Sequence, residues 1–274
     1  MVFRIQWLAA ACMLGLFSPS LRGGETLRVG GTGVALGGLQ VLARAYEKQH
    51  PGASIRVLPS IGSTGGIRAA IDGKLDVACT GRPLRPEEQV SGLVATPWVT
   101  TPFVFATHEA SAREDLSLAG VEDIFAGRRT TWKDGRPIRL ILRPKSDSSF
   151  AFLAGLSPGM AAALDQARAR PGITVGITDQ EALAEIEKTP GSFGTTVLGL
   201  VLSESRRVQV LPVNGSRPTE AGYPFRLTLI LLHREDSASA LARHFLAFVQ
   251  SREALRLLRR SGYQPLPATA GQGR

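Results

Sequence analysis

Cysteine is scarce in this chain of 274 residues, with Cys12 and Cys79 as the only two. Cys12 falls in an apolar N-terminal stretch typical of a cleaved leader, so Cys79 would remain alone in the mature protein. A single cysteine excludes an internal disulfide, and Cys79 is expected to be a buried, inert thiol in an apolar strand. The four histidines show no spacing typical of zinc ligands, so neither a metal site nor an organic cofactor is expected.

Apolar runs long enough to span a membrane are also absent. The longest run, residues 5–17, follows Arg4 and precedes the polar turn Ser18-Pro19-Ser20. A membrane helix needs roughly 20 apolar residues, whereas a positive residue followed by a shorter apolar run is typical of a secretion signal. We therefore expect a signal peptide over residues 1–24, no retained membrane helix, and a periplasmic location for the mature protein.

Acidic residues are outnumbered by basic ones, which gives the chain a formal net charge of +9. The basic residues are spread along the chain, and their close pairs are Arg128-Arg129, Arg206-Arg207 and Arg259-Arg260. No segment alternates basic and aromatic residues, so nucleic acid is not an expected partner. The positive charge indicates either a solvated basic surface or long-range attraction of anions toward a cleft.

Apolar periodicity in the first third of the chain predicts strands alternating with helices. Strands are expected at 27–29, 55–58 and 77–79, with helices at 36–46 and 66–71 between them. This order predicts a parallel sheet with helices on both faces. Ligands of such sheets bind at the carboxyl ends of the strands, where Gly31, Ser63 and Thr80 are expected to lie.

The segment 96–108 is rich in strand-forming residues and is interpreted as a crossover into a second lobe. Further strands are expected at 138–142, 173–177, 208–213 and 225–232, and further helices at 121–125, 158–168 and 181–188. Residues 241–258 form a long amphipathic C-terminal stretch. We expect residues 25–104 and 225–274 to form the first lobe and residues 105–224 the second.

Two short motifs suggest an anion site. Gly62-Ser63-Thr64-Gly65-Gly66 follows an apolar run and opens a helix, and Thr80-Gly81-Arg82 ends the next apolar run. Free backbone N–H groups, hydroxyls and the positive end of the helix dipole favour a bound anion, and glycines allow its close approach. A Gly/Ser turn also serves simply to reverse the chain, so the first motif alone does not distinguish the two interpretations.

Several segments together resemble the PstS-like phosphate-binding subunits of phosphate ABC transporters. The resemblance is carried, in order, by Gly62–Ile67, Asp76–Ala78, Thr80–Leu84, Asp123–Gly127, Trp132–Ile138, Arg143, Gly191–Gly194 and Tyr223–Phe225. It implies an α/β fold of the type II periplasmic binding-protein kind, with a ligand cleft between two α/β lobes. It further implies a monomeric, non-enzymatic protein that binds phosphate or a similar tetrahedral oxyanion and meets the permease of an ABC transporter.

The resemblance also implies roles for individual residues. Ser63 matches the phosphate-binding serine of the family, Thr64 and Gly65 would offer backbone N–H groups, and Arg143 matches the arginine that grips the anion. Ser63 could be a helix N-cap as well as a ligand donor, since the two roles are compatible, whereas the alternative for Arg143 is a surface residue at a strand end. The candidate ligand-binding set is Thr32, Ala35, Leu36, Ser63, Thr64, Gly65, Thr80, Gly81, Arg82, Arg143, Asp147, Ser148 and Ser149.

The chain departs from the family pattern at three places. Ala35-Leu36 stands where the family has Thr-Phe, which makes Thr32 a candidate for the missing hydroxyl. Gly81 replaces an aspartate that accepts a proton from the ligand in many members. Asp147, beside Ser148 and Ser149, stands where the family has a neutral Gly-Ser-Gly-Thr segment, and it either caps a helix or takes over as proton acceptor.

Other functions fit the sequence less well. Gly31-Thr32-Gly33 follows a predicted strand, but Leu36 occupies the place of the third glycine of a dinucleotide-binding enzyme. A secreted hydrolase would need a Gly-x-Ser-x-Gly elbow, which is absent. The departures at Ala35, Gly81 and Asp147 leave open a stand-alone sensor or an accessory binder of another anion on the same fold.

Overall fold

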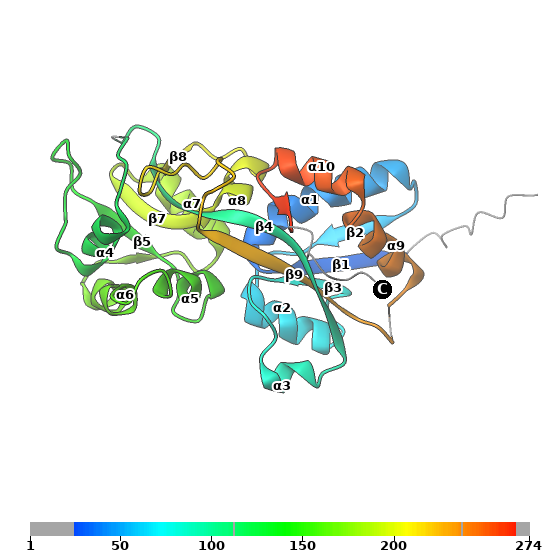
Figure 1. Cartoon of the computed structure of the whole chain (residues 1–274). Helices are drawn as coiled ribbons and strands as arrows, with labels where there is room; N and C mark the ends of the chain where they lie inside the picture. Colours follow the sequence, from blue (N-terminus) through cyan, green and yellow to red (C-terminus); the bar gives the residue numbers. More distant parts are fainter. Residues whose placement is uncertain (1–24, 112, 237, 267–274) are drawn as a thin grey trace, which may run out of the picture.

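The structure is a computed structural model in which residues 25–111, 113–236 and 238–266 are described (Figure 1). The expected signal peptide, with Cys12, lies outside these residues. Within the described ranges, no helix is both long and apolar enough to cross a bilayer.

The strands and helices alternate over the first third of the chain. The strands are β1 (Thr26–Gly31), β2 (Ser54–Val57), β3 (Val77–Thr80), β4 (Leu93–His108), β5 (Arg139–Leu142), β6 (Thr174–Val175), β7 (Ser192–Val197), β8 (Val208–Leu211), β9 (Arg226–Arg234) and β10 (Gln264–Pro265). The helices are α1 (Gly33–Gln49), α2 (Gly62–Ile71), α3 (Pro86–Gln89), α4 (Leu118–Ala126), α5 (Ser148–Ala154), α6 (Met160–Ala169), α7 (Asp179–Lys188), α8 (Leu198–Ser203), α9 (Ala240–Val249) and α10 (Arg252–Arg260).

Two groups of parallel strands lie at the two ends of the sheet. Its order is β2-β1-β3-β9-β4-β7-β5-β6, with β8 and β10 paired to β4 off the path. β1 runs parallel to β2 and β3, and β5 runs parallel to β6 and β7, whereas β9 and β4 are antiparallel to their neighbours. The predicted parallel order of the first three strands is therefore confirmed.

The long strand β4 connects the two units. It pairs with β9 as far as Pro102, and from Phe103 onward it pairs with β7. We call β1–β3 with α1–α3, α9 and α10 the first lobe, and β5–β8 with α4–α8 the second lobe. In Figure 1 the two lobes lie side by side, and β4 and β9 run from one to the other. The division at residues 104/105 and 224/225 stays a prediction.

Local side-chain chemistry explains several boundaries. The amphipathic stretch 241–258 forms two helices, because the Ser251 hydroxyl accepts the Ala254 N–H and starts α10 after α9 has ended. The predicted strand 173–177 is reduced to the two residues of β6.

The predicted burial of Cys79 agrees with the described core. Cys79 is fully buried, and burial raises the pKa of its thiol. Trp132 is packed rather than exposed to a ligand, and its indole N–H donates to the Gly191 carbonyl at 3.0 Å.

Candidate functional site

The N-terminus of α2 approaches the end of β1 more closely than side chains would allow. Gly31 has a φ of +120°, and a Cβ there would lie 2.2 Å from the Cys79 carbonyl oxygen. A Cβ on Gly66 would lie 2.7 Å from the Gly31 Cα. These two glycines let α2 start directly above the strand end, as the Gly/Ser motif predicts.

Ser63, near the start of α2, joins three segments of the chain. Its hydroxyl oxygen accepts the Gly81 N–H at 3.0 Å, and it lies 3.0 Å from the hydroxyl oxygen of Ser148. Both serines are buried. Because Ser148 begins α5 in the second lobe, this hydroxyl pair links the starts of two helices across the lobes, and both helices direct the positive ends of their dipoles here.

Asp147 is the N-cap of α5, which is one of the two roles left open by the sequence. Its Oδ1 accepts the Ser149 N–H at 2.8 Å, and its Oδ2 accepts a hydrogen bond from Arg143 Nη2 at 2.8 Å. Both oxygens therefore have partners within the protein, and the carboxylate is compensated by a helix N-terminus and a guanidinium.

Arg143 follows β5, and only 4% of its side chain is exposed. Nη1 donates to the Gly176 carbonyl at 2.6 Å, and Nε lies 3.4 Å from Asp179 Oδ1 without a hydrogen bond. A guanidinium carries five N–H donors, of which the hydrogen bonds to Gly176 and Asp147 use two. Arg143 is thus fixed in place and keeps donors for a further acceptor.

Asp179 pairs with Arg143 behind the cavity and is not among the residues predicted from the sequence. It is the first residue of α7, directly after the N-cap Thr178, whose hydroxyl accepts the Glu181 N–H at 3.1 Å. Burial raises the pKa of Asp179 to about 6, and the negative charge of Asp147 adds to this rise, whereas Arg143 opposes it. The Thr178-to-Glu181 capping box is the sequence signal that could have located this helix start.

The start of α1 lies against α7. A Cβ on Gly33 would lie 2.5 Å from Asp179 Oδ2, and the Gln180 side-chain amide donates to the Gly33 carbonyl at 3.0 Å. Thr32 is buried and its hydroxyl has no partner. Ala35 and Leu36 pack in the core, and the Ala35 N–H donates to the Thr32 carbonyl at 3.2 Å. Ligand contact by these two residues stays a prediction.

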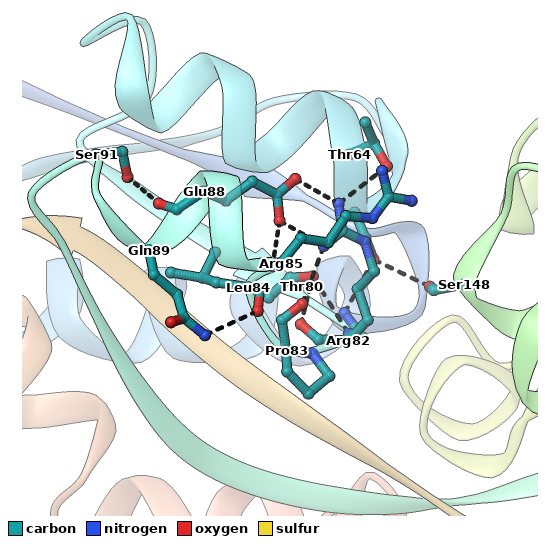
Figure 2. A network of polar contacts seen from close by, with 12 residues as sticks. Thr64, Thr80, Arg82, Pro83, Leu84, Arg85, Glu88, Gln89, Ser91 and Ser148 are labelled. Atoms are coloured by element: carbon teal, nitrogen blue, oxygen red, sulfur yellow. Dashed lines mark hydrogen bonds and ion pairs between the residues drawn. The ribbon is translucent and has the colours of Figure 1, made fainter.

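Arg82 is held within its own lobe (Figure 2). Nη1 and Nη2 donate to the two carboxylate oxygens of Glu88, each at 2.7 Å, and Nη2 also donates to the Thr64 hydroxyl at 3.2 Å. This bidentate pairing lowers the pKa of Glu88 to about 2. The Thr80 hydroxyl donates to the Arg82 carbonyl at 3.1 Å and thereby fixes the turn that carries the arginine.

A cavity of about 500 Å³ opens between the lobes at this place. It is lined by Ser60, Ile61, Gly62, Ser63, Thr64 and Arg85 of the first lobe and by Arg143, Pro144, Ser146, Asp147, Ile177 and Thr178 of the second. Four predicted residues, Ser63, Thr64, Arg143 and Asp147, line it directly. Gly81 and Ser148 contact Ser63, Ser149 is held by Asp147, and Arg82 contacts Thr64.

A larger cavity of about 680 Å³ lies elsewhere, along α8 and β8, and contains none of the predicted residues. Among the residues that the structure describes, no cluster of His, Cys, Asp and Glu could hold a metal ion. The chemistry of the smaller cavity, with hydroxyls, helix N-termini and a guanidinium, is that of an oxyanion site.

Comparison with known proteins places this chain among binding proteins. Residues 18–253 match the family model of the PBP superfamily domain. The phosphate-binding protein PstS 2 of Streptococcus agalactiae serotype V is 32% identical over 96 residues, which cover 35% of this chain and 32% of that protein. PstS 2 of Streptococcus pneumoniae serotype 4 is 31% identical over 94 residues, 34% of this chain. The match thus spans about a third of the length of these curated relatives.

Solved structures extend the similarity over nearly the whole chain. A putative phosphate ABC transporter substrate-binding protein with bound phosphate from Clostridium perfringens superposes with a TM-score of 0.75 at 19% identity, covering 89% of this chain and all of that one. An ABC-type phosphate transport receptor from Vibrio cholerae has a TM-score of 0.61 at 21% identity, covering 87% of this chain and 99% of that one. The expected type II binding-protein fold is confirmed.

Proposed function

This chain belongs to the PBP superfamily, and from this premise we propose that it is a non-catalytic periplasmic binding protein for phosphate or a similar tetrahedral oxyanion. Its two lobes would close on the ligand by a hinge motion about β4 and β9, and the closed form would meet the permease of an ABC transporter. We expect it to act as a monomer.

One observation carries this proposal: Ser63 and Arg143, from different lobes, line one cavity. Ser63 stands at the start of α2, and Arg143 keeps unused N–H donors toward an acceptor. Hydroxyls, helix N-termini and a fixed guanidinium together favour a bound oxyanion over a neutral ligand. Relatives named as phosphate-binding proteins match a third of the chain and support phosphate as the first candidate.

A second candidate is a stand-alone sensor or accessory binder of another anion on the same fold. It is favoured by the two carboxylates, Asp147 and Asp179, that face the single guanidinium of Arg143. Two carboxylates and one guanidinium carry a net negative charge at this buried place. That charge would discriminate between anions of different charge and protonation.

The proposal is tested by thermal unfolding of the ligand-stripped mature protein with phosphate, arsenate, sulfate, molybdate and phosphonates at neutral pH. A ligand at one hundred times its Kd stabilises the folded state by about 2.7 kcal/mol, which is readily measured. A shift with phosphate and arsenate supports the proposal. A shift with another anion alone supports the second candidate, and no shift with any of these oxyanions contradicts the proposal and favours a sensor or scaffold role.

A further inference from the structure

The cavity between the lobes persists although the two lobes already touch. The hydroxyl oxygens of Ser63 and Ser148 lie 3.0 Å apart, and the Gln180 amide of the second lobe donates to the Gly33 carbonyl of the first at 3.0 Å. A volume of about 500 Å³ nevertheless remains. Pockets of about 300–1,000 Å³ are typical of organic ligands, which are much larger than a phosphate ion. The space beside Ser63 and Arg143 is therefore larger than inorganic phosphate requires.

Two exposed isoleucines line this cavity, one from each lobe. Ile61, at the start of α2, is 51% exposed, and Ile177, just before the N-cap of α7, is 66% exposed. Pro144, which follows β5, adds a third apolar surface. Single exposed apolar side chains are common on proteins, but apolar side chains that share one pocket with a few polar groups are typical of a site for an organic molecule. Inorganic phosphate has no apolar part that could contact them.

Both isoleucines are held in place through their backbones. The Ile61 N–H donates to the Gly31 carbonyl at 3.2 Å, and the Ile177 N–H donates to Glu181 Oε2 at 2.9 Å. The Ile61 side chain also lies against Gly65, where an added Cβ would come within 3.1 Å of the Ile61 Cβ. The two apolar side chains thus form a surface that exists before a ligand binds, which lowers the entropy cost of binding.

The charged residues of the lining suit an anionic head group. Arg143 and Asp147 pair with each other, and the guanidinium of Arg85 forms no ion pair with a carboxylate that the structure describes. Two guanidinium groups and one carboxylate give the lining a net positive charge. The cavity therefore combines a positively charged, hydrogen-bonding part with an apolar part.

On the basis of the proposed function, we propose that this cavity binds a tetrahedral phosphorus anion that carries a short alkyl group, such as an alkylphosphonate or an alkyl phosphate. The oxygens of the head group would accept hydrogen bonds from Ser63 and Arg143, as those of inorganic phosphate would. The alkyl group, at the remaining corner of the tetrahedron, would contact Ile61 and Ile177. Because these two side chains belong to different lobes, the alkyl group would stabilise the same closed arrangement as the head group.

Titration calorimetry of the ligand-stripped mature protein with phosphate, methylphosphonate and propylphosphonate tests the inference. Burial of one CH₂ group strengthens binding by about fourfold, so propylphosphonate should bind at least about tenfold more tightly than methylphosphonate. Ethyl phosphate, whose chain has the same length as that of propylphosphonate, distinguishes attachment of the alkyl group through oxygen from attachment through carbon.

Alanine variants locate the alkyl group. Ile61→Ala and Ile177→Ala should each reduce the ratio of propylphosphonate to methylphosphonate affinity by at least about threefold, because each removes apolar surface from the cavity. Both side chains are exposed, so neither change should prevent folding. Val90→Ala is the matched control, since Val90 is 87% exposed and is not among the residues that line this cavity, and it should keep the ratio.

The outcomes separate this inference from the proposed function. An affinity that stays level or falls from methylphosphonate to propylphosphonate, while phosphate binds, would overturn the inference and leave the proposed function standing. A ratio that survives in both isoleucine variants would overturn the placement of the alkyl group in this cavity. No binding of phosphate or of either phosphonate by the unaltered protein would overturn the proposed function itself.

Discussion

Two arginines that occupy similar places in the sequence differ in how their guanidinium groups are paired with carboxylates. Arg82 and Arg143 each follow a strand end, and each was expected to contact the ligand. In the first lobe, Arg82 meets one carboxylate, Glu88, with two hydrogen bonds of 2.7 Å. In the second lobe, Arg143 meets two carboxylates, each through a different nitrogen, and its Nε keeps no hydrogen bond.

The difference separates an arginine whose charge is compensated within its own lobe from one whose neighbourhood leaves polar atoms without partners. Both Nη atoms of Arg82 donate to the Glu88 carboxylate, so the positive and negative charges of this pair compensate each other. Around Arg143 the negative charges exceed the positive one, and donors and acceptors remain unmatched in a buried place. Unmatched buried polar atoms destabilise the folded state, and they are typical of ligand-binding sites.

The largest expected effect comes from removing each guanidinium in turn. Arg143→Met should abolish measurable phosphate binding, a loss of more than about 100-fold, because it removes the cation of the site. It should also destabilise the fold by about 3–5 kcal/mol, since Asp147 and Asp179 would stay buried without their partner. Calorimetric titration and urea unfolding measure the two effects.

Arg82→Met is the matched control for that variant. It removes a half-buried pair, so we expect some loss of stability but a change in phosphate affinity of less than about fivefold. If Arg82→Met were to abolish binding while Arg143→Met retained it, the assignment of the two roles would be reversed.

The fold could be largely predicted from the sequence, because the apolar periods around α1 and the first three strands follow from local patterns. The helix start at Ser63 could be predicted because the Gly/Ser motif follows an apolar run and opens a helical pattern, although the motif alone does not distinguish an anion site from a chain reversal. Asp179 could not, because its importance arises from α7 meeting α1, a contact between segments far apart in sequence. The pairing of Arg82 was not predicted either, because it depends on the turn at Pro83 and the start of α3, which bring Glu88 within reach of the guanidinium.

The pH dependence of stability should have opposite signs in the two regions. The pKa of Asp179 is raised to about 6, so its folded form holds a proton more tightly than the unfolded chain, and stability falls as the pH rises from about 4 to 6. The pKa of Glu88 is lowered to about 2, so its contribution is present above about 4.5 and is lost as the pH falls toward 2.

Urea unfolding of the ligand-free protein across pH 2–7 measures both slopes. Asp179→Asn should flatten the upper window and leave the lower one, and Glu88→Gln should do the reverse. A slope in the upper window that survives in Asp179→Asn would show that another group titrates there.

A smaller effect than that of Arg143→Met is expected at Gly81, where the two regions meet. Its N–H donates to Ser63, and a Cβ at this position would lie 3.1 Å from the Ser148 hydroxyl oxygen of the opposite lobe. Gly81→Ala should therefore push Ser148 away by a few tenths of an ångström and weaken phosphate binding by roughly three- to tenfold, about 0.7–1.4 kcal/mol. The Arg82–Glu88 pair should be unaffected, so the acid slope of Glu88 should persist. Gly222→Ala, whose Cβ would meet nothing within 4 Å, is the control. Equal affinities for the two alanine variants would mean that the lobes do not approach each other at Ser63 and Ser148 when the ligand binds.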